Sequence, residues 1–520
     1  MSEQGNTGAD ALVGTLADCG VSVCFANPGT SEMNLVTALD RETRIRSVLC
    51  LFEGVASGAA DGFARVAGEP AMTLLHLGAG YLNAGANIHN ARRAHTPMIN
   101  VIGDHATYHV GYDAPLTSDI QALVEPNSVW VDTVANASEA GEKASLAYQA
   151  CLNGKQGPAM IILPADSAWT EGGQKAGSTA KPEKALAEDD KIVAAAEALK
   201  TAKNPLLLIG GEALLEDGLE HLARLAAAGI RTMTDTFVGR QTRGAGHFSP
   251  GKMQYFAEGA MEDIKDHDLM VMVGTQMPVA FFAYPEKPSV LVPEGCETLL
   301  VGGPEINSAQ AVKALADTLS CQEKAAKAER KRAEMPSGPV TPKSVGASLN
   351  RHMPANALVS DDGVTASLPI FLSTLTAEPH DWMNLTGGAI GQGMPLAIGA
   401  AIARPDAKTI CLSGDGAGMY TNQALWTMAR ENLDVTTIVF VNHSYRILNI
   451  ELQRTGAGNP GPAAQTMLNL GTPEIDWVAL GKAQGVHSEA VATAVEFDEA
   501  FERAMSIEGP KLIAVLLGGR

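Results

Sequence analysis

The sequence predicts an α/β protein built from three doubly wound, parallel-sheet domains. Short apolar runs alternate with helix-patterned segments along the whole chain, as they do in βαβ units. At 520 residues the chain is too long for one hydrophobic core. Two stretches interrupt the alternation, so the expected domains are 1–170, 190–321 and 344–520, with linkers at about 171–189 and 322–343.

Both expected linkers are rich in residues that break or solvate regular structure. The first contains Gly172-Gly173 and the Lys181-Pro182-Glu183-Lys184 segment. The second carries a charged, helix-like run, Glu323–Lys327, and ends in Pro336-Ser337-Gly338-Pro339. We therefore expect each stretch to connect domains rather than to belong to a core.

Composition excludes several classes of protein. A hydrophobic share of 46% with 18% charged residues is typical of a well-packed α/β enzyme. The net charge of −20 argues against a nucleic-acid partner. The seven cysteines lack metal-ligand spacing, and no targeting segment or membrane-length apolar run is evident, so we expect a cytoplasmic protein that does not bind membranes.

The first and third domains share a faint internal likeness. In the first, a small-residue helix at Glu53–Arg65 precedes a strand at Ala71–Leu75 and the run Gly78-Ala79-Gly80. In the third, a small-residue helix at Pro395–Arg404 precedes a strand and the run Gly414-Asp415-Gly416. This likeness indicates two related domains that face each other.

The third domain contains a βαβ unit with polar residues at both strand ends. A buried strand at Thr409–Leu412 leads into the glycines, a helix is expected at about 422–431, and the strand Val435–Val441 ends at Asn442. Parallel strands end at the same edge of a sheet, where such folds bind ligands. The two polar strand ends are therefore expected to form a single site.

The side chains at these strand ends are suited to a cation and a phosphate. Asp415 and Asn442, 27 residues apart, offer hard oxygen ligands for Mg²⁺, and the Ser444 carbonyl is a candidate third ligand. Gly414 and Gly416 let backbone N–H groups approach a phosphate closely. The alternative is an ordinary turn followed by a strand-end asparagine.

The central domain opens with Pro205–Ile209, a strand that runs into Gly210-Gly211. Such glycines can serve a nucleotide, but the dinucleotide fingerprint G-x-G-x-x-G is missing and tight turns also use them. FAD or another nucleotide is therefore not favoured there, although some relatives of the family named next carry FAD in this domain.

The segment from Gly414 to Asn442 resembles the cofactor motif of the thiamine diphosphate enzymes, which include acetolactate synthases, benzoylformate decarboxylase and pyruvate decarboxylase. The resemblance covers essentially the whole chain. It implies a pyrimidine-binding N-terminal domain, a diphosphate- and Mg²⁺-binding C-terminal domain, and Glu53 as the carboxyl group that activates the cofactor pyrimidine. Without the resemblance, Glu53 would be an ordinary helix-start glutamate.

Other cofactor contacts follow from the same resemblance. The segment Thr386–Gly391 resembles the one beneath the bent cofactor, with Ile390 as the wedge and the Gly388 carbonyl as a pyrimidine partner, although it also suits a glycine-rich turn before a helix. The resemblance also implies cofactor contacts from three further residues, which are Thr365, Ala417 and Tyr445.

On the substrate side, Phe25–Glu32 and Leu74–Gly78 resemble active-site segments of benzoylformate decarboxylase. They imply that Thr30 meets the substrate carboxylate and that His76 transfers protons. Ile447 and Glu451 are expected to line the pocket, although helical spacing also allows Glu451 to point outward.

Two features separate the chain from that decarboxylase. Val279–Tyr284 offers aromatic residues where the decarboxylase has a second active-site histidine, and Glu451 does not suit an aryl pocket. Stretches such as His89–Ala94 and Gly103–Tyr108 look like those of bacterial acetolactate synthase large-subunit-like proteins.

The resemblance implies decarboxylation of a 2-oxo acid with thiamine diphosphate and Mg²⁺, followed by carboligation to an aldehyde or a second 2-oxo acid. One alternative is simple decarboxylation, and another is a non-catalytic cofactor-binding subunit. A lyase acting on acyl-CoA is less favoured because the central domain shows no clustered Arg or Lys pattern. A homodimer or homotetramer with sites between subunits is expected.

Overall fold

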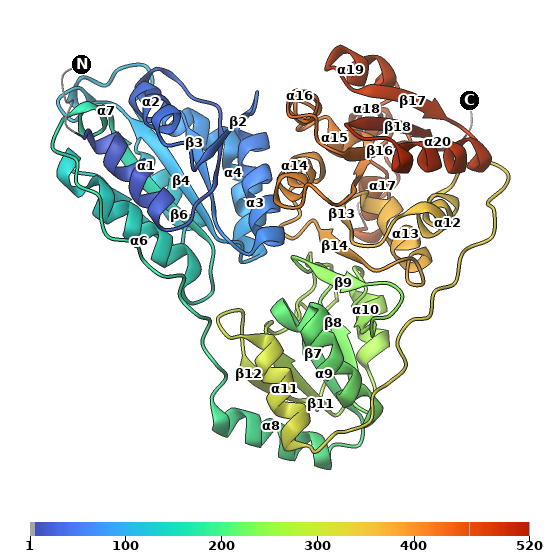
Figure 1. Ribbon diagram of the computed structural model, residues 1–520. Helices are drawn as coiled ribbons and strands as arrows, with labels where there is room; N and C mark the ends of the chain where they lie inside the picture. Colours follow the sequence, from blue (N-terminus) through green and yellow to red (C-terminus); the bar gives the residue numbers. More distant parts are fainter. Residues whose placement is uncertain (1–5, 457, 519–520) are drawn as a thin grey trace.

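The structure is a computed structural model that describes residues 6–456 and 458–518, and it contains three α/β domains with parallel sheets (Figure 1). The N-terminal domain (blue to teal) and the C-terminal domain (orange to red) lie side by side, and the central domain (green to yellow) lies below them. The predicted fold class is therefore confirmed.

The N-terminal sheet has six parallel strands in the order β2-β1-β3-β4-β6-β5. Its strands are β1 (Val23–Ala26), β2 (Arg46–Leu49), β3 (Ala71–Leu75), β4 (Met98–Asp104), β5 (Trp130–Thr133) and β6 (Pro158–Pro164). Its helices are α1 (Gly8–Asp18), α2 (Met33–Arg41), α3 (Glu53–Ala67), α4 (Leu77–Arg93), α5 (Ile120–Val124), α6 (Ala140–Leu152) and α7 (Ala165–Trp169). The glycines after β3 belong to the first turn of α4 and do not form a separate loop.

The central sheet has five strands in the order β10-β8-β7-β11-β12. They are β7 (Pro205–Ile209), β8 (Arg231–Thr234), β10 (Gly251–Lys252), β11 (Leu269–Val273) and β12 (Glu297–Gly302). The helices are α8 (Asp189–Thr201), α9 (Glu216–Ala227), α10 (Ala257–Ile264) and α11 (Ser308–Thr318).

The C-terminal sheet has seven strands in the order β17-β18-β16-β15-β13-β14-β9. Six are parallel: β13 (Ala357–Asp362), β14 (His380–Asn384), β15 (Thr409–Gly414), β16 (Val435–Val441), β17 (His487–Val491) and β18 (Lys511–Leu516). The seventh, β9 (Gln241–Arg243), comes from the central part of the chain and pairs antiparallel with β14. The helices are α12 (Pro342–His352), α13 (Ser367–Ser373), α14 (Gly393–Ala403), α15 (Asp415–Gly418), α16 (Ala424–Arg430), α17 (Arg446–Arg454), α18 (Pro462–Leu468), α19 (Trp477–Ala483) and α20 (Ala494–Ser506).

The two expected linkers run between α7 and α8 and between α11 and α12, and neither holds a helix in these fully described stretches. The helix-like reading of Glu323–Lys327 is therefore wrong. This run lies along α9 instead: Ala325 N–H donates to the Ala223 carbonyl, and Lys324 and Lys327 pair with Glu220. Contacts across the domain surface replace the hydrogen bonds within the run that a helix would need.

Helices α3 and α14, the two small-residue helices, pack directly against each other between the outer domains (Figure 1). A Cβ atom at Gly62 would lie 2.0 Å from the Leu396 carbonyl oxygen, and one at Gly399 would lie 1.9 Å from that of Ala59. The glycines therefore allow the two backbones to touch, which explains the small residues in both segments. Among the described residues, none of the helices combines the length and apolar character needed to cross a membrane.

Candidate functional site

The C-terminal group consists of Asp415, Asn442 and Ser444, which lie at the adjacent ends of β15 and β16. Asp415 is 3% exposed, and backbone N–H groups hold its carboxylate: Gly416 donates at 2.9 Å, Asn442 at 3.1 Å and His443 at 2.7 Å. Burial raises the pKa of Asp415 above its ordinary value, while these three donors act against the increase. The carboxylate is therefore fixed without any cationic side chain.

The amide of Asn442 is fixed in the same way. Its Oδ1 accepts a hydrogen bond of 2.9 Å from the Ser444 N–H, and the Ser444 hydroxyl accepts one from Asn449. Tyr445 packs over Gly416, where an added Cβ would lie 2.5 Å from the tyrosine ring. The loop after β16 thus folds back over the loop after β15.

The chemistry of this donor set fits a hard divalent cation bound together with a diphosphate. It offers one carboxylate and one amide oxygen, as Mg²⁺ prefers, and leaves further positions for phosphate oxygens. No group of three or more His, Cys, Asp or Glu side chains suited to a metal occurs within 6–456 and 458–518. Asp415 and Asn442, with the Ser444 carbonyl, are the groups that would hold Mg²⁺ together with diphosphate oxygens.

The N-terminal group consists of Glu53, His76 and Glu32 at the ends of strands β2, β3 and β1. Glu53 begins α3, is 7% exposed, and accepts a hydrogen bond of 3.0 Å from Asn83. Gly80 separates it from His76, since a Cβ there would lie 3.2 Å from Glu53 Oε1 and 3.4 Å from His76 Cβ. Two predicted site residues thus flank one glycine.

The carboxylate that holds His76 belongs to Glu32, which is not among the predicted site residues. His76 Nδ1 lies 2.8 Å from Oε2 of Glu32, whose side chain is fully buried. Glu32 also accepts hydrogen bonds from the Gly29 N–H and the Ser31 hydroxyl. Thr30, the predicted carboxylate contact, is exposed beside them at the start of the same short helical turn.

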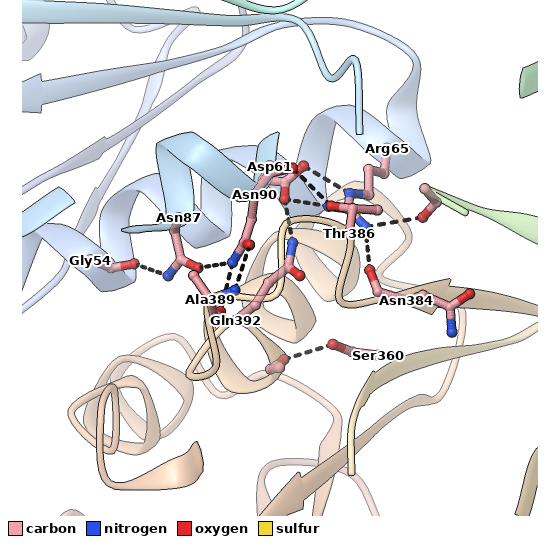
Figure 2. A network of polar contacts seen from close by, with 12 residues as sticks. Gly54, Asp61, Arg65, Asn87, Asn90, Ser360, Asn384, Thr386, Ala389 and Gln392 are labelled. Carbon is pink, nitrogen blue, oxygen red and sulfur yellow. Dashed lines mark hydrogen bonds and ion pairs between the residues drawn. The ribbon is translucent and has the colours of Figure 1, made fainter. Parts of the chain in front are cut away.

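The loop that carries Gly388 and Ile390 is tied to the N-terminal domain (Figure 2). Asn90 donates to the Ala389 carbonyl at 2.8 Å and accepts from its N–H at 3.2 Å. Asn90 also donates to Asn87, which in turn donates to the Gly54 carbonyl at 2.7 Å. A continuous run of hydrogen bonds therefore links the backbone beside Glu53 to the backbone beside Ile390.

A buried ion pair anchors both ends of this loop (Figure 2). Arg65 pairs with Asp61 at 2.7 Å, and their side chains are 3% and 0% exposed. Arg65 also donates to the Asn384 carbonyl and to the Thr386 hydroxyl before the loop, while Gln392 after it donates to Asp61 at 2.6 Å. The position of Ile390 relative to α3 is thereby set within one chain.

Asp362, at the end of β13, supports the same loop from the C-terminal domain. Its Oδ2 accepts from the N–H groups of Gly391 and Gly393, whereas its Oδ1 has no hydrogen-bond partner in the described structure. Burial raises the pKa of Asp362 to about 7, and neighbouring Asp361 adds to the increase. Strand β13 also leads to the predicted diphosphate contact Thr365, in a short helical turn.

Backbone strain accompanies three of the predicted positions. Leu77, Val364 and His443 have positive φ angles of 49°, 52° and 55°. They adjoin His76, Thr365 and Asn442 respectively. Side chains rarely adopt this conformation, and such strain tends to collect at functional sites.

One of the predicted pocket residues, Glu451, lies where the C-terminal and central domains meet. Glu451 on α17 accepts a hydrogen bond of 2.7 Å from Tyr284, so its carboxylate is turned toward the central domain. Phe281, from the same aromatic stretch, lies against Gly388, where a Cβ would be 2.6 Å from its ring. An aromatic side chain thus reaches the loop of Ile390. Ile447, on the first turn of α17, is half-buried.

The glycines of the central domain line a cavity of about 1390 Å³. Gly210 and Gly274, at the ends of β7 and β11, approach so closely that a Cβ on either would lie 2.5 Å from the carbonyl oxygen of the other. Basic side chains from the N-terminal domain, the first linker and the central part of the chain also line it, among them Arg92, Arg93, Lys181, Lys184 and Arg240. The sequence did not reveal this basic cluster, because its members come from three separate stretches.

Of the predicted residues, the described chain brings Glu53 and His76 together in one group and Asp415, Asn442 and Ser444 in another. No hydrogen bond between described residues connects Glu53 or His76 with Asp415. Glu32, Asn87, Asn90 and Asp362 were not predicted as site residues. Of these four, only Glu32 has a contact that its local sequence could indicate: it lies three residues after Gly29 and accepts a hydrogen bond from the Gly29 N–H.

Comparison with known proteins identifies this arrangement. Residues 6–125 match the N-terminal TPP-binding domain of the thiamine pyrophosphate enzymes, residues 192–295 match their central domain, and residues 369–515 match their C-terminal TPP-binding domain. The chain belongs to the thiamine pyrophosphate enzyme family. The family resemblance expected from the sequence is therefore confirmed.

Individual relatives agree with that assignment. The chain is 46% identical to a Mycobacterium tuberculosis protein named "Putative acetolactate synthase large subunit IlvX", over 98% of this chain and 99% of that protein. It is 25% identical to benzoylformate decarboxylase of Pseudomonas aeruginosa, over 95% and 96%. The thiamine diphosphate-dependent 4-hydroxybenzoylformate decarboxylase of Rhodococcus jostii RHA1 has the same fold, with a TM-score of 0.84 at 23% identity over 99% of this chain and 100% of that one.

Proposed function

We propose that the protein binds thiamine diphosphate with Mg²⁺ and decarboxylates a 2-oxo acid, with carboligation of the product to a second carbonyl compound as in acetolactate synthases. The main support is the pair of groups at the strand ends of the two outer domains. One offers oxygen ligands at Asp415 and Asn442, and the other offers a buried carboxyl group at Glu53. The family relationship supports the choice of cofactor.

When bound, thiamine diphosphate supplies the carbon nucleophile that adds to a 2-oxo acid and accepts the electrons left when CO₂ departs. Glu53 would hold or exchange a proton at the pyrimidine ring, shielded from water by its burial. Ile390 and the Gly388 carbonyl would orient the pyrimidine, while Asp415, Asn442 and the Ser444 carbonyl would hold Mg²⁺. Gly414, Gly416, Ala417, Thr365 and Tyr445 would complete the diphosphate cradle.

The substrate would lie between Thr30 and His76 on one side and Ile447, Glu451 and Phe281 on the other. We further propose that each site combines Glu53 of one subunit with Asp415 of another, in a homodimer or homotetramer. Support comes from the tie between the two outer domains of one chain, which holds Glu53 and Asp415 in separate groups. FAD binding by the central domain is not favoured, and we expect a cytoplasmic location, both on the basis of the sequence.

Release of an aldehyde without carboligation is the second candidate. It is favoured by the Glu32–His76 pair, because an oriented imidazole can deliver a proton to the product carbon. A panel of 2-oxo acids, assayed with and without an added aldehyde and analysed by mass spectrometry, separates the two outcomes.

The substitution Glu53→Gln tests the proposal. It retains the size of the side chain and removes the carboxyl group, so we expect 2-oxo acid turnover to fall by about 100-fold or more. Glu69→Gln, at an exposed position just after α3, is the matched control. Turnover near the wild-type rate in the Glu53 variant would contradict the mechanism, and cofactor binding without turnover in the wild type would favour a non-catalytic subunit.

A further inference from the structure

His76 carries the only ring of the N-terminal group, and its hydrogen-bond contacts with described residues are all made through one nitrogen, Nδ1. Nδ1 lies 2.8 Å from Glu32 Oε2 and 3.4 Å from the Ser31 hydroxyl. No described residue forms a hydrogen bond with Nε2, and the side chain is 23% exposed. The two ring nitrogens therefore have different surroundings, and only Nε2 is available to a ligand.

Glu32 is fixed independently of His76. Its Oε2 also accepts the Gly29 N–H at 2.8 Å, and its Oε1 accepts the Ser31 hydroxyl at 2.6 Å. Gly103 on the neighbouring strand β4 leaves the space that Glu32 fills, since a Cβ there would lie 1.8 Å from Oε1. Because an N–H group can donate only to an acceptor, the Gly29 contact forces an acceptor oxygen to face the imidazole.

We infer that Glu32 is a positioning residue that holds His76 in the Nδ1-protonated form and thereby leaves Nε2 for proton exchange with the substrate. Gly29 completes the device, since a Cβ there would lie 2.2 Å from Nδ1 and would displace the ring. The carboxyl group of Glu53 lies across Gly80 from the ring and is not hydrogen-bonded to the imidazole.

The inference rests on the proposed function only for the role of Nε2. Which ring nitrogen of His76 carries the proton can be measured in the resting protein, without substrate or turnover. Solid-state ¹⁵N NMR of the full-length, ¹⁵N-histidine-labelled protein at about pH 8 distinguishes the two neutral forms of an imidazole, and His76→Phe assigns the signal.

In the wild type we expect the His76 signal of an Nδ1-protonated ring. Glu32→Gln should retain that form, because the Gly29 N–H still selects the oxygen of the amide at the position facing the ring. Glu32→Ala removes the acceptor and should shift His76 toward the Nε2-protonated form that free imidazole prefers. A wild-type ring protonated at Nε2 would overturn the inference even if the alanine variant does not fold.

Turnover provides the second readout. We expect Glu32→Ala to lower kcat by about tenfold or more with little change in cofactor affinity, and Glu32→Gln to restore part of the loss. If the NMR result holds but His76→Phe turns over 2-oxo acids at the wild-type rate, the proton-transfer role in the proposed function is wrong. If the ring form does not respond to Glu32→Ala, the positioning role is wrong.

Discussion

The two groups at the strand ends hold their charged side chains in different ways. In the C-terminal group, three backbone N–H groups of adjacent loops hold Asp415. In the N-terminal group, side chains from separate elements hold the carboxylates: Asn83 donates to Glu53, and His76 contacts Glu32. The first arrangement follows from a local βαβ unit, whereas the second requires the whole sheet to be in place.

This difference predicts that the C-terminal group is intolerant of change at its one carboxylate. Asp415→Ala should remove a cation ligand and leave three donors without an acceptor, at a cost of about 4 kcal/mol in transition-state stabilisation, or about a thousandfold in kcat/KM. Calorimetry with thiamine diphosphate and Mg²⁺ should show weakened binding. Asp406→Ala, at an exposed site in the same domain, is the control. Retained Mg²⁺-dependent binding would contradict the assignment.

The connection between the groups should be the next most sensitive feature. Arg65→Met leaves the buried Asp61 carboxylate without its cation, so we expect the free energy of unfolding to fall by about 3 kcal/mol. Arg404→Met breaks an exposed pair and should have a much smaller effect, because solvent screens the two charges. Guanidinium denaturation of both variants tests the comparison, and equal losses would show that the buried network does not anchor the loop.

Asp362 allows a pH test of the loop that carries Ile390. With its pKa raised to about 7, the folded protein binds a proton that the unfolded chain releases near pH 4. This contribution to stability is therefore full below about pH 4 and is lost as the pH rises to about 7, with a slope of at most about 1.4 kcal/mol per pH unit. Asp362→Asn should remove it, so denaturation midpoints of variant and wild type should diverge in favour of the variant between pH 4 and 7. Parallel curves would contradict the prediction.

The smallest effect is expected where helix α17 of the C-terminal domain meets the central domain. Tyr284→Phe removes the hydrogen bond to Glu451 and should cost about 1 kcal/mol of unfolding free energy. Tyr108→Phe, at an exposed position, should have no measurable effect. A change in KM for the 2-oxo acid in the first variant alone would show that Glu451 orients α17 beside the substrate.

The same difference explains how much of the site could be predicted from the sequence. The Asp415–Asn442 pair was predictable because only helical segments and strand β16 separate its members, and the neighbouring strands β15 and β16 bring them together. Glu53 and His76 could be named, but the contact between His76 and Glu32 depends on the adjacency of β1 and β3. The hydrophobic periodicity of a sequence predicts strands but not their order in the sheet. Contacts between residues on neighbouring strands therefore cannot be predicted from it.

Longer-range features were missed for the same reason. Gln392 donates a hydrogen bond to Asp61, although the two residues are 331 positions apart in the sequence. The local sequence around either residue does not predict this contact. The three domains themselves were predictable, since alternation of strands and helices is a local property. The charged run at Glu323–Lys327 was misread as helix-like because charge pattern alone does not show that Glu220 will bind its lysines.

The central claim is that the two groups act on one cofactor, with Glu53 and Asp415 supplied by different subunits. Coexpression of Glu53→Gln and Asp415→Ala chains with different affinity tags, followed by tandem purification, gives mixed dimers that carry one defect in each chain. We expect these dimers to recover about half of the wild-type turnover, because one of the two sites then receives both intact residues. Mixed dimers as inactive as either parent would contradict the claim.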